Sequence, residues 1–196
     1  MAREAVVLSD DEKMDLYAPE IAKQMRGFSS RRQLQEYFSN LTATDPLNRV
    51  LEAEFRTIFP DQVLAFVDRL SMVHSLEVRT AYLDTDFVTF IAGLRGELKI
   101  KNGETKYLLK QAARKYFPDE MVDRKKEGFL MPVTEWLSGD LEGYVRDTLS
   151  EERLKRHGIF NPTKVQKLIA SGNKDYRHVN KVFSLLVFQE WFDLYF

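Results

Sequence analysis

Apolar residues recur at steps of three and four along most of the chain, which is typical of amphipathic α-helices. Met14, Tyr17, Ile21 and Met25 follow this spacing after Ser9, a residue type that favours the start of a helix. The same periodicity predicts further helices over residues 31–38, 45–59, 61–74, 84–94 and 106–115. Pro60 is expected to end the helix over 45–59. The first half of the chain is therefore expected to be helical.

The second half shows the same pattern in shorter pieces. Helices are expected over residues 133–139, 140–150, 151–158 and 161–172, the last opened by Asn161-Pro162 and closed by Gly172. Residues 178–196 are apolar on most of their circumference, so we expect that helix to be buried. Asn102-Gly103 is the clearest turn signal. No segment has a convincing strand pattern, so the sequence predicts an all-α unit of about nine or ten helices.

Composition narrows the classes of protein. The chain has 196 residues, 29 Lys and Arg against 30 Asp and Glu, and no Cys. A net charge of −1 gives no electrostatic reason to expect a nucleic acid or a membrane surface as partner. The lack of Cys excludes disulfides, thiolate metal sites and a cysteine nucleophile within these residues. No run approaches the about 18 apolar residues of a membrane span, and the start is not a signal peptide, so we expect a cytoplasmic protein.

Glycine usage adds one restriction. The chain has nine Gly, and neither GxGxxG nor GxxxxGK[ST] occurs. These glycine-rich loops are the common cradles for nucleotide phosphates. We therefore do not expect these residues to supply the main phosphate loop of a nucleotide site.

Charged residues are concentrated among apolar ones in the segment 67–84, VDRLSMVHSLEVRTAYLD. Burying an unpaired charge is costly, so such residues need partners. One interpretation is a buried ion-pair network that fixes a helix to its neighbours. The other is the wall of a polar ligand site, in which Arg79 could hold a carboxylate or phosphate with two hydrogen bonds.

A second unusual segment is Arg124-Lys125-Lys126-Glu127-Gly128-Phe129, in an expected loop that ends at Pro132. A short basic run is usually a solvated face. A lysine beside a glycine and an anchoring aromatic could instead neutralise a polyphosphate as charge builds in a transition state. Arg153–Arg156 is a further basic run, but no basic stripe with interleaved aromatics supports nucleic-acid binding.

The three histidines do not indicate a metal site. His74 and Glu77 are three residues apart and could face together, whereas His157 and His178 fall in separate predicted helices. No HExxH or comparable ligand spacing occurs. We expect structural histidines and no metal ligands.

These segments, in this order, carry a family resemblance. The stretch DRLSMVHSLEVRTAYLD resembles the asparagine synthase family, whose synthetase domain has a DRxSMxxSLEVRxxxLD signature. The run KYLLK followed by FPDEMVDRKKEGFLMP is similar to the family's KxLL and RKKxGFxxP motifs, and LLVFQEWF is similar to its C-terminal helix. The resemblance covers about residues 61–196, and residues 1–60 match weakly.

The resemblance implies an amidotransferase (a ligase of asparagine and amino-acid biosynthesis) that activates aspartate as β-aspartyl-AMP with ATP and magnesium. Ammonia, released by a glutaminase domain with a cysteine nucleophile, then attacks this intermediate. The chain resembles only the C-terminal helical portion of the α/β synthetase domain, because the glutaminase Cys and the SGGxDS loop are absent from residues 1–196. We therefore expect most of that domain's sheet to lie outside the chain, no turnover by the chain alone and no cofactor bound to it.

The resemblance also assigns residues. Lys126 matches the lysine implicated in stabilising the pentavalent adenylation transition state and the departing pyrophosphate. Glu77, Arg79 and Asp84 match the signature that lines the cleft, and we expect Arg79 to face the substrate or acyl-adenylate while Glu77 and Asp84 hold it. Asp68 and Arg69 look structural. Thr80-Ala81-Tyr82 replaces the usual Val-Pro-Phe, which loosens the expected turn and leaves the acid substrate open.

The expected organisation follows from the extent of the match. Residues 1–60 form a peripheral helical arm, and residues 61–196 form the asparagine-synthase-like region. The expected partner is the upstream synthetase and glutaminase half, in the same gene product or as a separate subunit; association with a second copy stays open. The alternative is a non-catalytic helical interaction module that kept the fold and lost the chemistry.

Overall fold

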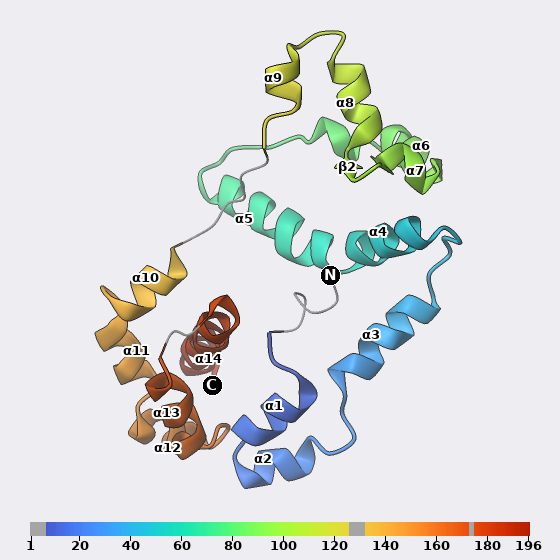
Figure 1. Cartoon of the computed structure of the whole chain (residues 1–196). Helices are drawn as coiled ribbons and strands as arrows, with labels where there is room; N and C mark the ends of the chain where they lie inside the picture. Colours follow the sequence, from blue (N-terminus) through green and yellow to red (C-terminus); the bar gives the residue numbers. More distant parts are fainter. Residues whose placement is uncertain (1–6, 126–131, 173–174) are drawn as a thin grey trace. The chain divides into compact units, whose positions relative to one another are not determined.

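The computed structural model describes residues 7–125, 132–172 and 175–196 (Figure 1). Packing divides the chain into two compact units. Unit 1 comprises Met1–Arg32 and Gly128–Phe196, and unit 2 comprises Gln33–Glu127. The residues of the predicted N-terminal arm are thus shared between the units, and the unit boundaries do not coincide with residue 60. Within the described ranges, no helix combines the length and apolarity needed to cross a lipid bilayer.

The regular elements of unit 1, among its described residues, are helices. Its helices are α1 (Asp10–Leu16), α2 (Pro19–Gln24), α10 (Val133–Ser138), α11 (Glu142–Thr148), α12 (Glu151–His157), α13 (Pro162–Ala170) and α14 (Tyr176–Tyr195), and α3 (Ser30–Ser39) continues from unit 1 into unit 2. Local signals set several of these bounds. Asn161 caps α13 by accepting from the Lys164 N–H, and Gly158 ends α12 with a φ of +68°, which glycine tolerates without strain.

The first predicted helix is interrupted. Ser9 forms the expected cap, because its hydroxyl accepts from the Glu12 N–H while the Glu12 carboxylate accepts from the Ser9 N–H. The periodic pattern continues to Met25, but the helix ends at Leu16 and a new one begins at Pro19. Proline lacks the N–H that a helix interior needs, so Pro19 starts a helix rather than extending one. Tyr17 instead forms an isolated antiparallel β-bridge with Phe160.

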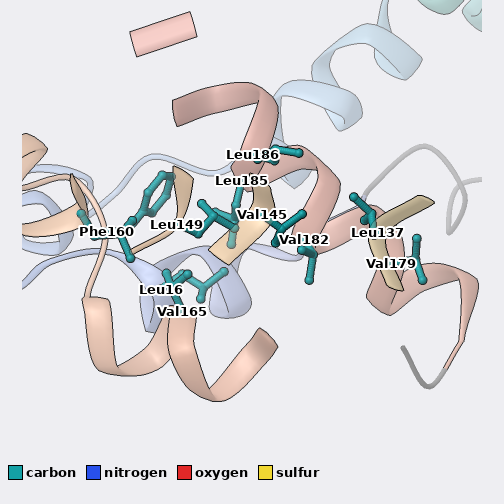
Figure 2. Packing of buried hydrophobic residues seen from close by; sticks show 11 residues of the cluster. Leu16, Leu137, Val145, Leu149, Phe160, Val165, Val179, Val182, Leu185 and Leu186 are labelled. Atoms are coloured by element: carbon teal, nitrogen blue, oxygen red, sulfur yellow. The ribbon is translucent and has the colours of Figure 1, made fainter. Parts of the chain in front are cut away.

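The core of unit 1 is built around α14, against which α10 and α11 pack. Figure 2 shows side chains from several helices meeting in this cluster. Its buried members are Leu16, Leu137, Val145, Leu149, Leu154, Phe160, Val165, Val179, Val182, Leu185 and Leu186. The predicted burial of the last helix is confirmed for one face, from Val179 to Gln189, while Tyr176 at its start is 71% exposed. Its end is not buried, since Leu194 is 77% exposed and Tyr195 is exposed as well.

Unit 2 contains shorter and less regular elements. They are α4 (Pro46–Arg56), a π-helix η1 (Phe59–Leu64), α5 (Ala65–Val73), a 3₁₀ turn η2 (Ala81–Leu83), α6 (Thr85–Gly93), α7 (Gly96–Lys99), α8 (Tyr107–Ala113) and α9 (Asp119–Val122). The helix predicted over 61–74 therefore begins with a π-helical turn. Pro60 lies in the first turn of that π-helix and does not close α4, which ends at Arg56.

One expectation about strands is wrong. Ile100–Lys101 (β1) and Glu104–Thr105 (β2) form an antiparallel hairpin in the register Ile100 to Thr105 and Lys101 to Glu104. Asn102 and Gly103 connect the strands with φ values of +53° and +81°, the signature of a tight hairpin turn. Strands of two residues are too short to show an alternating pattern. The described chain is otherwise helical, as expected for an all-α portion, with more and shorter helices than nine or ten.

Burial differs sharply between the units. Among the described residues of unit 2, Ala53 and Gly96 alone are buried. Every large apolar side chain of this unit keeps contact with solvent.

Candidate functional site

The segment with the densest charge pattern links α5 to α6 in unit 2. His74 ends α5, Ser75 follows with a φ of +55°, and the chain then runs without helix to Thr80, whose backbone is extended. The Leu76 N–H donates to the Ser71 carbonyl and fastens the start of this segment to α5. A turn of this kind places Leu76–Thr80 beyond the end of the helix.

Glu77 and Arg79 form an ion pair in this segment. Nε of Arg79 donates to Oε1 of Glu77 at 2.9 Å, and Nη2 lies 2.8 Å from the same oxygen. The Arg79 side chain is 87% exposed and that of Glu77 is 70% exposed. Such a surface pair contributes at most about 1 kcal/mol to stability. Because a guanidinium has five N–H donors, the pair with Glu77 does not use all of those of Arg79.

Asp84 has a different task in the structure. Its Oδ1 accepts from the backbone N–H groups of Asp86 and Phe87, both at 3.1 Å, and so caps α6. It makes no contact with Arg79 among the described residues. The turn before it forms without the proline of the family pattern, because the Leu83 N–H donates to the Thr80 carbonyl at 2.9 Å.

The remaining charges of segment 67–84 are exposed. Asp68, Arg69 and His74 lie on the surface of unit 2, and the segment's one ion pair within the described residues is that of Glu77 and Arg79. The structure therefore does not contain the buried ion-pair network that one interpretation predicts. What it places together is a carboxylate and a guanidinium at the surface.

The second predicted segment begins at a charged cluster that the sequence did not reveal. Asp123, at the end of α9, accepts from Arg114 Nη2 at 2.7 and 3.0 Å and from Lys110 Nζ at 3.2 Å. Glu104 of β2 lies 3.4 Å from Lys110, and Asp119 lies 3.3 Å from Arg114 Nε. The hydrogen bond with Asp123 raises the pKa of Lys110 above its usual value, although partial burial opposes this.

We call Lys110, Arg114 and Asp123 the α8–α9 clamp. It holds the residue that immediately precedes Arg124 and Lys125. Lys126, the predicted catalytic residue, lies outside the described residues. The clamp could not be read from the sequence because its members come from two helices that pack only in the folded chain.

Unit 2 also contains a cavity that the sequence did not predict. It has a volume of about 540 Å³ and lies between α4 and α6, lined chiefly by apolar side chains such as Phe55 and Phe87. Glu52 and Lys99 in its lining already have partners. N–H groups of Ala43 and Thr42 hydrogen-bond Glu52 and lower its pKa to about 2, and Lys99 donates to Asn48 at 2.6 Å. Glu77, Arg79 and Asp84 do not line this cavity.

In unit 1, the arginines of the basic run 153–156 form ion pairs with α14. Arg153 Nη2, Arg156 Nη2 and His157 Nε2 lie 2.5, 2.8 and 2.8 Å from the carboxylate of Asp193 on α14. Burial would raise the pKa of Asp193, but the hydrogen bond from Arg153 and the charge of His157 lower it overall. These contacts join α12 to α14. They also neutralise the two arginines that a nucleic-acid site would need.

Comparison of the sequence with known proteins identifies the family of this chain. The family model of asparagine synthase matches residues 3–193. Asparagine synthetase [glutamine-hydrolyzing] 1 of Bacillus subtilis (strain 168) is 29% identical over 163 residues, which are 83% of this chain and 26% of that protein. No solved structure matches the chain significantly.

Two further relatives show the range of the similarity. A putative asparagine synthetase [glutamine-hydrolyzing] of Mycobacterium tuberculosis (strain ATCC 25618 / H37Rv) is 26% identical over 75% of this chain and 22% of that protein. Amidase chyE of Penicillium rubens is 22% identical over 63% of this chain and 20% of that protein. The asparagine synthase model thus matches nearly the whole of a helical chain whose surface carries the LEVR ion pair. The chain belongs to the asparagine synthase family.

The chain spans about a quarter of the length of the first two of these relatives. The family match begins at residue 3, so it includes the first 60 residues that the motifs alone match weakly. Magnesium, which the family resemblance implies, finds no ready site in the described residues, where no cluster of three or more His, Asp or Glu could hold a metal ion. We derive no step through a metal from these residues.

Proposed function

We propose that this chain is the C-terminal helical part of an asparagine-synthase-type amidotransferase, which forms an amide from aspartate by way of β-aspartyl-AMP. The exposed Glu77–Arg79 pair supports this proposal most directly. It lies in the family's LEVR signature, contributes little to folding and, among the described residues, does not use all the N–H donors of Arg79.

Each residue has a part in the proposed reaction. Arg79 binds the carboxylate of the acid or the phosphate of the acyl-adenylate, and Glu77 holds the guanidinium in a fixed orientation. Lys126 neutralises charge on the pyrophosphate as it departs. Asp84 acts indirectly, because by capping α6 it fixes the end of the turn that follows Arg79. The phosphate loop is supplied by the upstream part of the synthetase.

The test is ATP–pyrophosphate exchange with aspartate. We expect no exchange by the purified 196-residue chain, and exchange once it is mixed with the part of the Bacillus subtilis relative that this chain does not match. Clear exchange by the chain alone would contradict the proposed division of the site. So would its absence from a mixture in which the two polypeptides form a complex.

Lys126→Ala should lower exchange by that mixture by about 10²–10³-fold, the usual loss when one charged group leaves a transition-state site. Lys125→Ala is the matched control, because it removes an adjacent lysine of the same run and should leave the rate within about threefold. Equal rates for Lys126→Ala and the unaltered chain would remove Lys126 from the mechanism.

A non-catalytic interaction module is the second candidate, and the exposed apolar residues of unit 2 favour it. ATP binding separates the two functions. If the mixture forms a complex that does not bind ATP, the interaction module is correct and the amidotransferase is not.

A further inference from the structure

Unit 2 lacks a buried apolar core among its described residues. The described residues of unit 1 bury eleven apolar side chains in one cluster, whereas unit 2 buries none larger than Ala53. Folding is driven mainly by burial of apolar surface, and large exposed apolar patches mark interaction sites. The side chains that unit 2 leaves exposed therefore call for a surface to cover them.

Those side chains are ordered along one helix. Phe66, Val67, Leu70 and Val73 follow each other on α5 at steps of one, three and three residues, the spacing of a single helical face, and Val63 precedes them in η1. All five are exposed, with Phe66 at 61% and Val73 at 76%. We call this row the α5 stripe. A helix that presents such a face to water is amphipathic in sequence but lacks the partner that its pattern requires.

The stripe continues into the segment that carries Arg79. Leu76 and Val78 are exposed at 59% and 46% and alternate with the charged pair. The backbone N–H groups of residues 77–79 donate to no carbonyl within the described chain. In an extended chain, alternate residues point to opposite sides. A surface that covered Leu76 and Val78 would then leave Glu77 and Arg79 on the opposite side.

We propose that the α5 stripe, with Leu76 and Val78, is the surface on which the remaining part of an asparagine-synthase-type polypeptide docks. This inference rests on the proposed function. The occupant follows from length, because the chain spans only 26% and 22% of two relatives that otherwise match it along most of its residues. It also follows from position, because the stripe leads directly into the LEVR signature.

The test is binding without ATP. The chain is titrated with the part of the Bacillus subtilis relative that it does not match, and the dissociation constant is measured by calorimetry. Phe66→Asp and Val73→Asp should each weaken binding at least about tenfold, as expected for a charge placed in an apolar interface. Val187→Asp is the matched control, because Val187 is an exposed valine of α14 in unit 1. It should bind like the unaltered chain.

Four outcomes would overturn the inference. The first is no binding at all, and the second is equal weakening by Val187→Asp. The third is a homodimer in sedimentation velocity that Val73→Asp dissociates, since a second copy would then be the occupant. The fourth is loss of helical circular dichroism by Phe66→Asp and Val73→Asp in the free chain, since the stripe would then be used within it. A complex that forms through the stripe but does not catalyse exchange contradicts only the proposed function.

Discussion

Glu12 shows how one side chain can serve both a local and a distant purpose. It closes the capping box of α1 and also accepts from Arg177 and Lys181 of α14, at 2.8 and 2.6 Å. Burial would raise its pKa, but the hydrogen bonds from Lys181 and from the Ser9 N–H lower it to about 2. The sequence predicts the cap from the Ser9 spacing. The contacts with α14 are more than 160 residues away and have no sequence signal.

The lowered pKa sets the direction of a pH effect. A carboxylate whose pKa is lower in the folded state stabilises the fold above its unfolded pKa of 4.5 and loses that contribution as the pH falls towards 2. Glu12→Gln should therefore lower the free energy of unfolding at pH 7, and the difference from the unaltered chain should shrink between pH 4.5 and 2. Urea titrations at pH 7, 4 and 3 measure this.

Asp11→Asn is the matched control for that series. Asp11 lies in the same helical turn and feels the same helix dipole, but it has no ion-pair partner among the described residues. Its substitution should lower stability less than Glu12→Gln at pH 7. An equal loss for both variants, or a Glu12→Gln difference that does not change with pH, would contradict the assigned role.

At the scale of elements, the α8–α9 clamp joins α8 to the end of α9 just before the RKK run. Asp123→Asn removes the charge that Lys110 and Arg114 share while keeping the size of the side chain. A network of this kind contributes about 1 kcal/mol to local stability. The fraction of molecules in which this region is locally unfolded should therefore rise about fivefold in the variant. Tryptic cleavage after Arg124 and Lys125 under native conditions should accelerate to the same degree.

Asp119→Asn is the comparison for the clamp. Asp119 is 78% exposed and touches only Nε of Arg114, at 3.3 Å, so its loss should change cleavage less than Asp123→Asn. Cleavage at other sites and the circular dichroism spectrum should remain unchanged in both variants. Acceleration at every site would mean that Asp123 stabilises the whole unit and not the entry to the run.

Helix-forming segments were predictable because their signals are local. Ser9 and Asn161 lie where caps were expected, and the periodicity located α3 and α13 within a few residues. The hairpin at Asn102-Gly103 was missed although its turn was found, because its strands are too short to show a pattern.

Tertiary relationships were not predictable in the same way. An apolar stripe predicts that a helix has an inner face, but not which surface covers it. The pattern of residues 61–74 therefore predicted a helix but did not indicate that its apolar face is exposed. Of the candidate site, the LEVR segment and its Glu77–Arg79 pair follow from sequence, whereas the cap formed by Asp84 and the clamp depend on packing.

For the whole molecule, the difference in burial between the units predicts how the free chain unfolds. Both tryptophans, Trp136 in α10 and Trp191 in α14, belong to unit 1, while far-UV circular dichroism reports helices of both units. Unit 2 lacks a buried core, so its helices should unfold at lower urea concentration. The circular dichroism transition should therefore begin before the change in tryptophan fluorescence, and the two curves should not coincide.

Two substitutions assign these transitions to the units. Leu154 is fully buried in unit 1, so Leu154→Ala should lower the free energy of the fluorescence transition by about 2–5 kcal/mol and leave the early circular dichroism phase in place. Val73 is exposed, so Val73→Ala should change both transitions by less than about 0.5 kcal/mol. Adding the upstream polypeptide should move the early circular dichroism phase to higher urea concentration, because the α5 stripe is then covered. Coincident curves in the free chain would show that unit 2 is stable without that partner.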